Sequence, residues 1–167
     1  MKKYISIFVL ALGMSLAMAS CSTETDEPAG GTAVEAMAGH WVVVADVIED
    51  GVVYEDPYGI GEWNLYTYNT AANDADQMWI SDDGNFWDFT LKTPISLENM
   101  TFACTDVYIY SDSDGNDVTC TITDGKVIKN GGLNVNGKPT DAIEFKIEYA
   151  DDPGTIYYIH GVRYAGF

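Results

Sequence analysis

Residues 141–167 read DAIEFKIEYADDPGTIYYIHGVRYAGF, and this stretch says most about the fold. A turn signal, Asp151-Asp152-Pro153-Gly154, separates two β-rich segments, 142–150 and 155–164. In the first segment apolar and charged residues alternate strictly, and a period of two with one apolar face is typical of a half-buried antiparallel strand. The stretch therefore predicts a hairpin with one buried face. Its apolar positions are Ile143, Phe145, Ile147 and Tyr149.

Similar patterns recur upstream and predict about eight to ten strands, mostly joined by short turns. No stretch after the first 20 residues has a convincing helical period. The chain therefore predicts an all-β fold, an antiparallel up-and-down barrel of about eight strands, with a β-sandwich as the alternative. The expected strands upstream of the hairpin are 40–48, 52–55, 63–70, 78–81, 86–93, 101–110, 118–123 and 126–129.

The first 20 residues predict a cleaved lipoprotein signal peptide. Lys2 and Lys3 precede an apolar run that is shorter than the roughly 20 residues of a spanning helix. Met18-Ala19-Ser20-Cys21 resembles the lipobox of bacterial lipoproteins, although Met18 stands where that motif usually has leucine. The resemblance implies lipidation at Cys21, with the membrane contacted only through this N-terminus. The alternative is an ordinary signal peptide followed by a chance cysteine.

A flexible acidic tether is expected at 21–36, followed by one domain at 37–167. The tether is rich in Ser, Thr, acids, Pro and Gly, which cannot build a core. Its acids Glu24, Asp26 and Glu27 resemble the surface-export signal of Bacteroidetes lipoproteins, and a plain solvated linker is the alternative. The expected location is the outer membrane, facing the periplasm or the exterior.

The chain is strongly acidic, with a formal net charge of −18. Loss of Lys2 and Lys3 would leave 6 basic residues against 26 acidic ones, a charge of −20. Such a chain repels phosphate backbones, so nucleic acid is not an expected partner. The charge favours solubility and mutual repulsion, and we expect a monomer.

Two residues at opposite ends of the domain point to a closed barrel. Gly39-His40-Trp41 stands near its start, and Arg163, the only arginine, stands near its end. This pairing resembles the calycins, in which an arginine of the last strand packs across a Gly-x-Trp tryptophan of the first. A closed meander must pair these two strands, and a cation over an indole stabilises the contact by about 0.5–2 kcal/mol. The alternative is a core Trp41 and an exposed Arg163.

The overall layout resembles a Bacteroidetes family of lipid-binding putative hydrolases, small calycin-like lipoproteins. The resemblance would cover about residues 37–167, and it implies a β-barrel with a lipid-binding interior. It supplies no catalytic motif. The segments that carry it, besides Trp41, are Trp79-Ile80-Ser81-Asp82, Thr101-Phe102, Gly125-Lys126-Val127, 141–145 (DAIEF) and 161–167 (GVRYAGF).

The sequence contains few groups of residues suited to catalysis or metal binding. His40 and His160 are the only histidines, and no Gly-x-Ser-x-Gly elbow occurs. A hydrolase is therefore a third hypothesis, and we expect no cofactor. The run 112–117 is similar to a calcium loop, but glycine stands at place four instead of six, so a hairpin turn is the better account. We expect no metal site.

Cys104 and Cys120 lie in one predicted hairpin, and export would permit a disulfide. A hairpin centred on Asp112 places the two cysteines directly opposite each other. A hairpin centred on Asp114 places Cys104 opposite Asp124 and Cys120 opposite Tyr108, out of bonding reach. The sequence leaves both registers open.

The leading functional hypothesis is a non-catalytic protein that binds a small hydrophobic ligand, a lipid, in an apolar cavity of the barrel. The aromatic residues expected to face the barrel could equally fill its core. They are Trp63, Trp87, Phe89, Phe102, Tyr108, Phe145 and Tyr157. The second hypothesis is a structural or glycan-contacting surface module with exposed aromatic rows. Its contacts would be Tyr66, Tyr68, Tyr108, Tyr110 and Tyr158.

Overall fold

The structure, a computed structural model, describes residues 31–164 and 166. The expected signal peptide, Cys21 and most of the expected tether lie outside these residues. The described part of the chain contains strands and turns and no helix, hence none able to cross a membrane. The strands are β1 (Gly39–Glu49), β2 (Val52–Tyr54), β3 (Trp63–Asn69), β4 (Gln77–Ser81), β5 (Thr90–Ser96), β6 (Thr101–Ser111), β7 (Asp117–Leu133), β8 (Pro139–Tyr149) and β9 (Ile156–Arg163).

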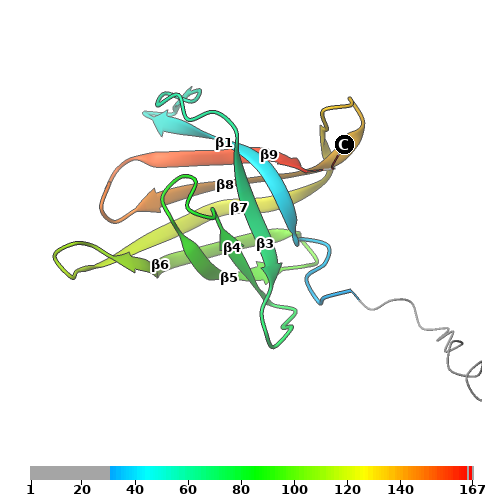
Figure 1. Cartoon of the computed structure of the whole chain (residues 1–167), viewed down its shortest axis with the longest axis horizontal. Coiled ribbons are helices and arrows are strands. Elements are labelled where there is room, and N and C mark those ends of the chain that lie inside the picture. The colour runs from blue at the N-terminus through cyan, green and yellow to red at the C-terminus, as the bar shows by residue number, and fades with distance from the viewer. Residues whose placement is uncertain (1–30, 165, 167) are drawn as a thin grey trace, which may run out of the picture. The chain divides into compact units, whose positions relative to one another are not determined.

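Eight of the strands form a closed antiparallel barrel, which confirms the predicted fold and rules out the sandwich. The barrel order is β1-β3-β4-β5-β6-β7-β8-β9, and β9 pairs back onto β1 from Trp41–Arg163 to Ile48–Ile156 (Figure 1). The ninth strand, β2, folds back on the end of β1 as a short hairpin. From β3 to β9 each strand pairs with the next strand of the chain, as expected of a meander. The pairing of β1 with β3 skips β2, which lies between them in the sequence.

Side chains fill the interior of the barrel. Each of its strands contributes residues that are at most 3% exposed. An eight-stranded barrel has an interior just wide enough for such filling, and residues without accessible surface border no water-sized void. Among the residues that the structure describes, the barrel therefore encloses no open apolar cavity of the kind that we expected. The core includes Trp41, Leu65, Ile80, Leu91, Phe102, Ile122, Phe145 and Ile159.

The packed domain begins earlier than residue 37. Val34 and Met37 are fully buried, and the backbone around them makes turn hydrogen bonds, such as Met37 N–H to the Val34 carbonyl at 2.8 Å. The expected tether therefore ends before Val34 instead of at residue 36. The polar composition of residues 21–36 did not reveal this packing, because the two apolar side chains alone are enough to hold the end of the segment against the core.

The region from 118 to 129 forms one strand, β7, instead of the two predicted strands. Asp124-Gly125, which we interpreted as a turn, is a β-bulge: Asp124 has φ 55° and the register with β8 shifts between Thr123 and Lys126. A glycine suits this place because a Cβ on Gly125 would collide with the carbonyl oxygen and ring of Phe102 on β6. Turn residues and bulge residues share the same backbone requirements, so the sequence alone could not separate them.

The predicted strand 86–93 begins later, at Thr90, because residues 82–89 form a loop built around one carboxylate. Asp82 is fully buried, and its two oxygens accept five backbone N–H groups at 2.7–3.1 Å. These bonds replace the ladder bonds that a strand would make. The donors are Gly84, Phe86, Trp87, Asp88 and Phe89.

Candidate functional site

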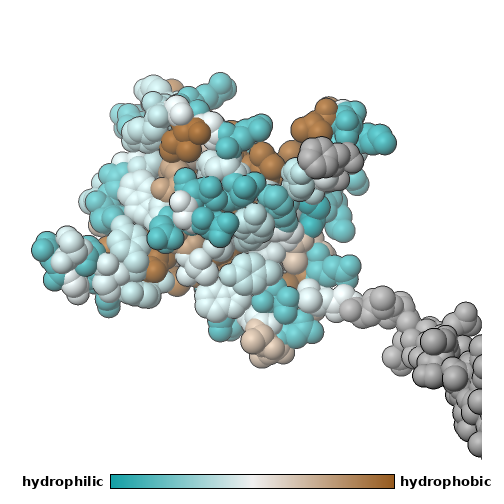
Figure 2. Space-filling model, in the orientation of Figure 1, coloured by the Kyte–Doolittle hydropathy of each residue, from teal (hydrophilic) through white to brown (hydrophobic). Residues whose placement is uncertain are grey.

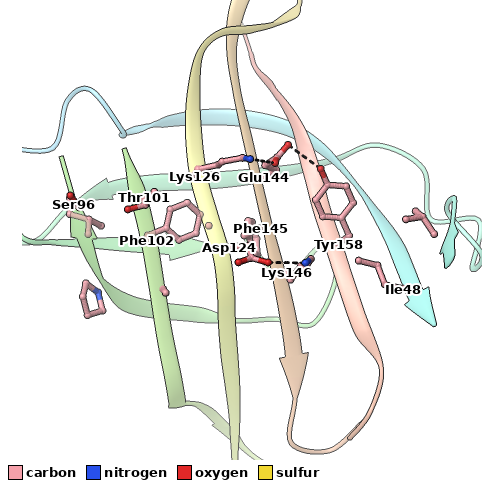
Figure 3. Close-up of a pocket in the computed structure, with 15 residues that line it drawn as sticks. Ile48, Ser96, Thr101, Phe102, Asp124, Lys126, Glu144, Phe145, Lys146 and Tyr158 are labelled. Atoms are coloured by element: carbon pink, nitrogen blue, oxygen red, sulfur yellow. Dashed lines mark hydrogen bonds and ion pairs between the residues drawn. The ribbon is translucent and has the colours of Figure 1, made fainter. Parts of the chain in front are cut away.

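A pocket of about 810 Å³ lies over the sheet from the end of β5 to β9 and the β1–β2 hairpin (Figure 3). Most of its lining side chains alternate with core residues, as Lys126, Glu144 and Lys146 do, so the pocket lies on the outer face of the barrel. Its apolar lining comprises Ile48, Val53, Pro94, Ile95, Phe102, Ala103 and Phe145, together with the Tyr158 ring. The volume is within the range of small-molecule sites, roughly 300–1,000 Å³.

Two cross-strand ion pairs form the polar part of the pocket. Lys126 on β7 contacts Glu144 on β8 at 2.7 Å, and Lys146 on β8 contacts Asp124 on β7 at 2.7 Å. Each of the two strands carries one acid and one base, two residues apart on the outer face. Every charge therefore has a neighbour of opposite sign both along its own strand and across to the other strand. We call Asp124, Lys126, Glu144 and Lys146 the charge quartet.

The pKa shifts of Asp124, Lys126 and Glu144 favour their charged forms. The hydrogen bond and charge of Lys146 lower the pKa of Asp124, and those of Glu144 raise the pKa of Lys126. Burial raises the pKa of Glu144, but hydrogen bonds from Lys126 and Tyr158 outweigh that effect and leave it lowered. These three groups are therefore charged near neutral pH.

Tyr158 extends this network away from the quartet. Its hydroxyl donates to Glu144 at 3.0 Å, and its ring stacks on His160 with the ring centroids 4.8 Å apart. His160 in turn bonds the buried carboxylate of Asp46 at 2.9 Å. Burial, followed by the bond to Glu144, raises the pKa of Tyr158 to about 12. The hydroxyl therefore stays protonated and acts as a donor at neutral pH.

A cluster of aromatic rings closes one end of the barrel. The Asp82 loop places Phe86 parallel to Trp63, with centroids 5.5 Å apart, and Trp87 on Tyr149 at 4.5 Å. The Nε1 atom of Trp63 and the hydroxyl of Tyr149 are buried without a hydrogen-bond partner. Burial raises the pKa of the Tyr149 hydroxyl well above its ordinary value. The cluster seals the core at this end.

The structure places the predicted ligand residues in the core, in the aromatic cluster and, for Tyr108, on the exposed surface. Phe102 and Phe145 lie in the core beneath the outer pocket, where they are at most 3% exposed and their ring centroids are 5.6 Å apart. The other inward-facing members belong to the core and the aromatic cluster, where they are packed by protein. These are Trp63, Trp87, Phe89 and Tyr157.

The prediction that Tyr108 faces the barrel is wrong, since its side chain is 53% exposed. Residues of β6 with even numbers face inward up to Cys104, but Asp106 has φ 52° and the register shifts between Cys104 and Val107. This bulge reverses the faces of the residues that follow it. Period-two reasoning continued across the bulge and assigned Tyr108 to the wrong face.

Trp41 and Arg163 meet at the seam of the barrel. The Arg163 guanidinium lies over the Trp41 indole, with Cζ 4.4 Å from the ring centroid. It also donates to the Ala38 carbonyl oxygen and to Asp141 at 3.3 Å. The Trp41 indole donates to Thr67 at 2.8 Å. These bonds fix the first and last barrel strands at one end.

Cys104 and Cys120 are buried free thiols. Cys104 lies opposite Ile122 and Cys120 opposite Val107, which is neither of the two registers considered from the sequence. The bulges in β6 produce this third register. Burial, and secondarily the charge of Cys104, raises the pKa of Cys120 to about 12, and burial raises that of Cys104 as well. Neither thiol is activated as a nucleophile.

The histidines show no catalytic pairing in the described part of the chain. His40 bonds Asn64 at 2.8 Å and His160 bonds Asp46, so neither imidazole bonds a serine, threonine or cysteine nucleophile. Within the same residues no group of three metal-ligating side chains occurs. Asp112 instead accepts from the backbone of Asp114 and Asn116, which closes the β6–β7 turn.

The tyrosines expected to form a contact row are dispersed. Tyr66 and Tyr68 lie on β3, Tyr108 and Tyr110 on β6, and Tyr158 on β9, and no two of these strands are paired. The charge quartet, by contrast, was not among our candidates. Its signal was present, because the alternation of β8 already placed Glu144 and Lys146 together on the outer face.

Comparisons with known proteins identify the family. The sequence matches the family model described as lipid-binding putative hydrolase over residues 26–167. No curated protein matches the chain. A crystal structure of a protein of unknown function from Bacteroides ovatus is similar with a TM-score of 0.45 and 12% identity, covering 75% of this chain and 41% of that one. The chain thus spans less than half the length of that protein. Since the family model covers most of the sequence, the chain belongs to the lipid-binding putative hydrolase family.

Proposed function

We propose that the protein binds a small amphipathic lipid in the outer pocket, without catalysing its conversion. The observation that carries this proposal is an 810 Å³ pocket in which exposed apolar residues stand beside two ion pairs. Membership of a lipid-binding family supports it. The filled barrel interior leaves the outer face as the place where a ligand finds room without displacing the core.

The pocket suits an amphiphile because apolar and charged side chains line it on neighbouring strands. Pro94 and Ile95 on β5 and Ala103 on β6 line one side of the pocket. The quartet lies on β7 and β8, with Ile48 of β1 on the far side (Figure 3). An acyl chain covering these apolar groups gains about 25 cal/mol per Å² of apolar surface removed from water. A polar head gains hydrogen bonds from the quartet. On the face visible in Figure 2, by comparison, hydrophobic residues occur in small separate groups.

The absence of catalysis is part of the proposal. The bonding of both histidines and the raised pKa values of both buried thiols support it. Purified protein should therefore release no product from p-nitrophenyl esters above the uncatalysed rate. Turnover that is lost on His160→Ala would contradict this part of the proposal and leave lipid binding standing.

A tryptophan placed in the pocket provides the binding test. Ala103 is exposed on β6 and lines the pocket, so Ala103→Trp should occupy the acyl site and weaken binding of a fluorescent fatty-acid probe by at least about tenfold. Ala71→Trp is the matched control, because Ala71 is exposed in the β3–β4 connection away from the pocket. Equal binding by wild type and both variants would contradict the pocket assignment.

We also propose that the chain is a lipoprotein anchored through Cys21 in the outer membrane. The layout of residues 1–21 supports this, and the acids after Cys21 support display at the surface. Metabolic labelling with an alkyne fatty acid should mark the wild-type protein and leave Cys21→Ser unlabelled. Labelling of Cys21→Ser to the same extent would contradict the anchor.

A further inference from the structure

The outer pocket has no net charge, although the chain around it carries −18. Lys126 and Lys146 balance Asp124 and Glu144, and every other lining residue is uncharged. Two of the six basic residues that follow Lys3 are thus concentrated at one pocket. An acidic chain that only needed solubility would not require them there.

The alternation of the four charges is a further restriction. On β7 the order along the outer face is acid then base, and on β8 the base Lys146 lies beside Asp124 and the acid Glu144 beside Lys126. Positive and negative groups are therefore neighbours both along and across the strands. Opposite charges are 2.7 Å apart across the strands, and residues two apart along one strand are about 6.7 Å apart. The separation of the phosphate and the nitrogen in an ethanolamine or choline phosphate falls between these two spacings.

The quartet retains hydrogen-bonding capacity for a ligand. An ammonium group has three donors, and each lysine uses one of them on a carboxylate. A carboxylate offers about four lone-pair sites, and Glu144 uses two, for Lys126 and Tyr158. The phosphate of a ligand could accept hydrogen bonds from the unused lysine N–H groups. An amine of the same ligand could donate to the unused carboxylate sites, and both ion pairs would stay intact.

A ligand with a single charge fits less well. A simple anion would meet two lysines that are already paired, within a strongly acidic molecule that repels it. A simple cation would be attracted at long range but would have the lysines as neighbours. A zwitterion meets groups of opposite sign at both of its ends, and the Tyr158 ring adds a face for a quaternary ammonium.

We infer that the pocket selects lipids with a zwitterionic head group, in which a phosphate and an amine or quaternary ammonium are two carbons apart. This inference rests on the proposed function, since it assigns the head group of the same lipid. The quartet holds the head group, and the apolar lining of β5 and β6 beside it, which includes Pro94, Ile95 and Ala103, holds the acyl chain.

Amphiphiles with one dodecyl-length chain and different head groups test the inference. Dissociation constants are measured calorimetrically below the micellar concentration for dodecylphosphocholine, laurate, dodecyltrimethylammonium and dodecyl maltoside. Dodecylphosphocholine should bind about tenfold or more tightly than each of the others, equivalent to about 1.4 kcal/mol. Phosphocholine without a chain should bind far more weakly, which distinguishes a lipid site from a site for the free head group.

Two double variants locate the selectivity. Lys126→Gln/Glu144→Gln removes one charge of each sign, so the net charge is unchanged, and the preference for dodecylphosphocholine should fall to less than about threefold. Lys92→Gln/Glu62→Gln is the matched control: it also removes one acid and one base, but at exposed positions outside the pocket, and the preference should persist.

The possible results separate the two proposals. Binding of all four amphiphiles with equal affinity, or tightest binding of laurate, dodecyltrimethylammonium or the maltoside, would overturn the head-group inference while lipid binding stands. Equally tight binding of chain-free phosphocholine would overturn both in favour of a small polar ligand. If none of the amphiphiles bound, the proposed function itself would be wrong.

Discussion

At the scale of single residues, a few polar side chains fix features that the apolar pattern leaves undetermined. Asp82 determines the path of eight residues by accepting five backbone N–H groups, and Arg163 joins the Trp41 ring, the Ala38 carbonyl and Asp141. Both are charged groups, and hydrogen bonds to charged groups contribute about 1.5–3 kcal/mol each. Replacement of either residue should therefore lower the free energy of unfolding by more than an ordinary surface substitution does.

Asp82→Asn should destabilise the protein by roughly 2–4 kcal/mol, because an amide group turns donors toward the backbone N–H groups and lacks the charge. Chemical unfolding in urea measures the loss, and Trp87 fluorescence should shift toward the red as the loop opens. Asp83→Asn is the control, since Asp83 is exposed with φ 53°, a conformation that asparagine tolerates. An Asp82→Asn protein as stable as Asp83→Asn would contradict the role assigned to the carboxylate.

Arg163→Lys should lower the free energy of unfolding by about 1–3 kcal/mol, although the charge is kept. An ammonium cannot stack flat on Trp41 and at the same time donate to Ala38 and Asp141. Thermal and urea unfolding provide the measurement. Lys92→Gln is the comparison, because Lys92 lies 5.5 Å from the Trp79 ring at an exposed position and should matter by less than about 0.5 kcal/mol. Equal effects of the two substitutions would contradict the seam role of Arg163.

At the scale of strands, the outcome of sequence-based prediction depended on regularity. The strict alternation of β8 gave the strand, its buried face and its place in a barrel directly from the residues. The bulges at Asp106 and at Asp124 could not be predicted in the same way, because each inserts one residue and reverses every later assignment on its strand. For that reason Tyr108 was assigned inward, and the register of Cys104 and Cys120 was missed.

The candidate site depended on the same irregularity. The quartet spans the Asp124 bulge. The inward face of Val118, Cys120 and Ile122, continued regularly along the strand, would place Asp124 and Lys126 inside the barrel instead of on its outer face. The seam pair Trp41 and Arg163 could be predicted because barrel closure alone brings their strands together. The pocket could not, since a hollow on an outer face depends on how strongly the strands twist and bend.

The buried thiols of β6 and β7 make the stability of the fold depend on alkaline pH. Unfolded cysteine loses its proton near pH 9.0, whereas burial keeps Cys120 protonated in the folded protein up to about pH 12. Above pH 9 the unfolded state therefore binds fewer protons, and the free energy of unfolding should fall as the pH rises, by roughly 1–3 kcal/mol between pH 9 and 11. Tyr158, whose pKa is also about 12, adds to the loss at the upper end.

Urea unfolding at several pH values from 7 to 11 measures this slope. Cys120→Ala should be less stable than wild type by a constant amount below pH 9, because it leaves a small cavity, but its slope above pH 9 should be shallower. An unchanged slope would show that Cys120 does not contribute to the pH dependence.

At the scale of the whole molecule, the charge of −18 opposes compactness. Acidic groups repel one another across the barrel surface, and salt screens this repulsion with a Debye length of about 10 Å at 0.1 M. The melting temperature at pH 7 should therefore rise by several degrees between 10 and 500 mM NaCl. Near pH 4, where many carboxylates take up protons, the rise should become much smaller. A melting temperature that falls with salt at pH 7 would mean that the ion pairs outweigh the repulsion.

The closure of the barrel also determines the order in which the chain can fold. The seam joins the start and the end of the domain, so that Arg163 bonds the Ala38 carbonyl across 125 positions of sequence. Every other barrel pairing except β1–β3 links consecutive strands, and such local hairpins form fast, whereas closing a long loop costs more entropy and slows folding. We therefore expect an open, curved sheet of hairpins as an early species, with the docking of β1 against β9 as the last and rate-limiting event.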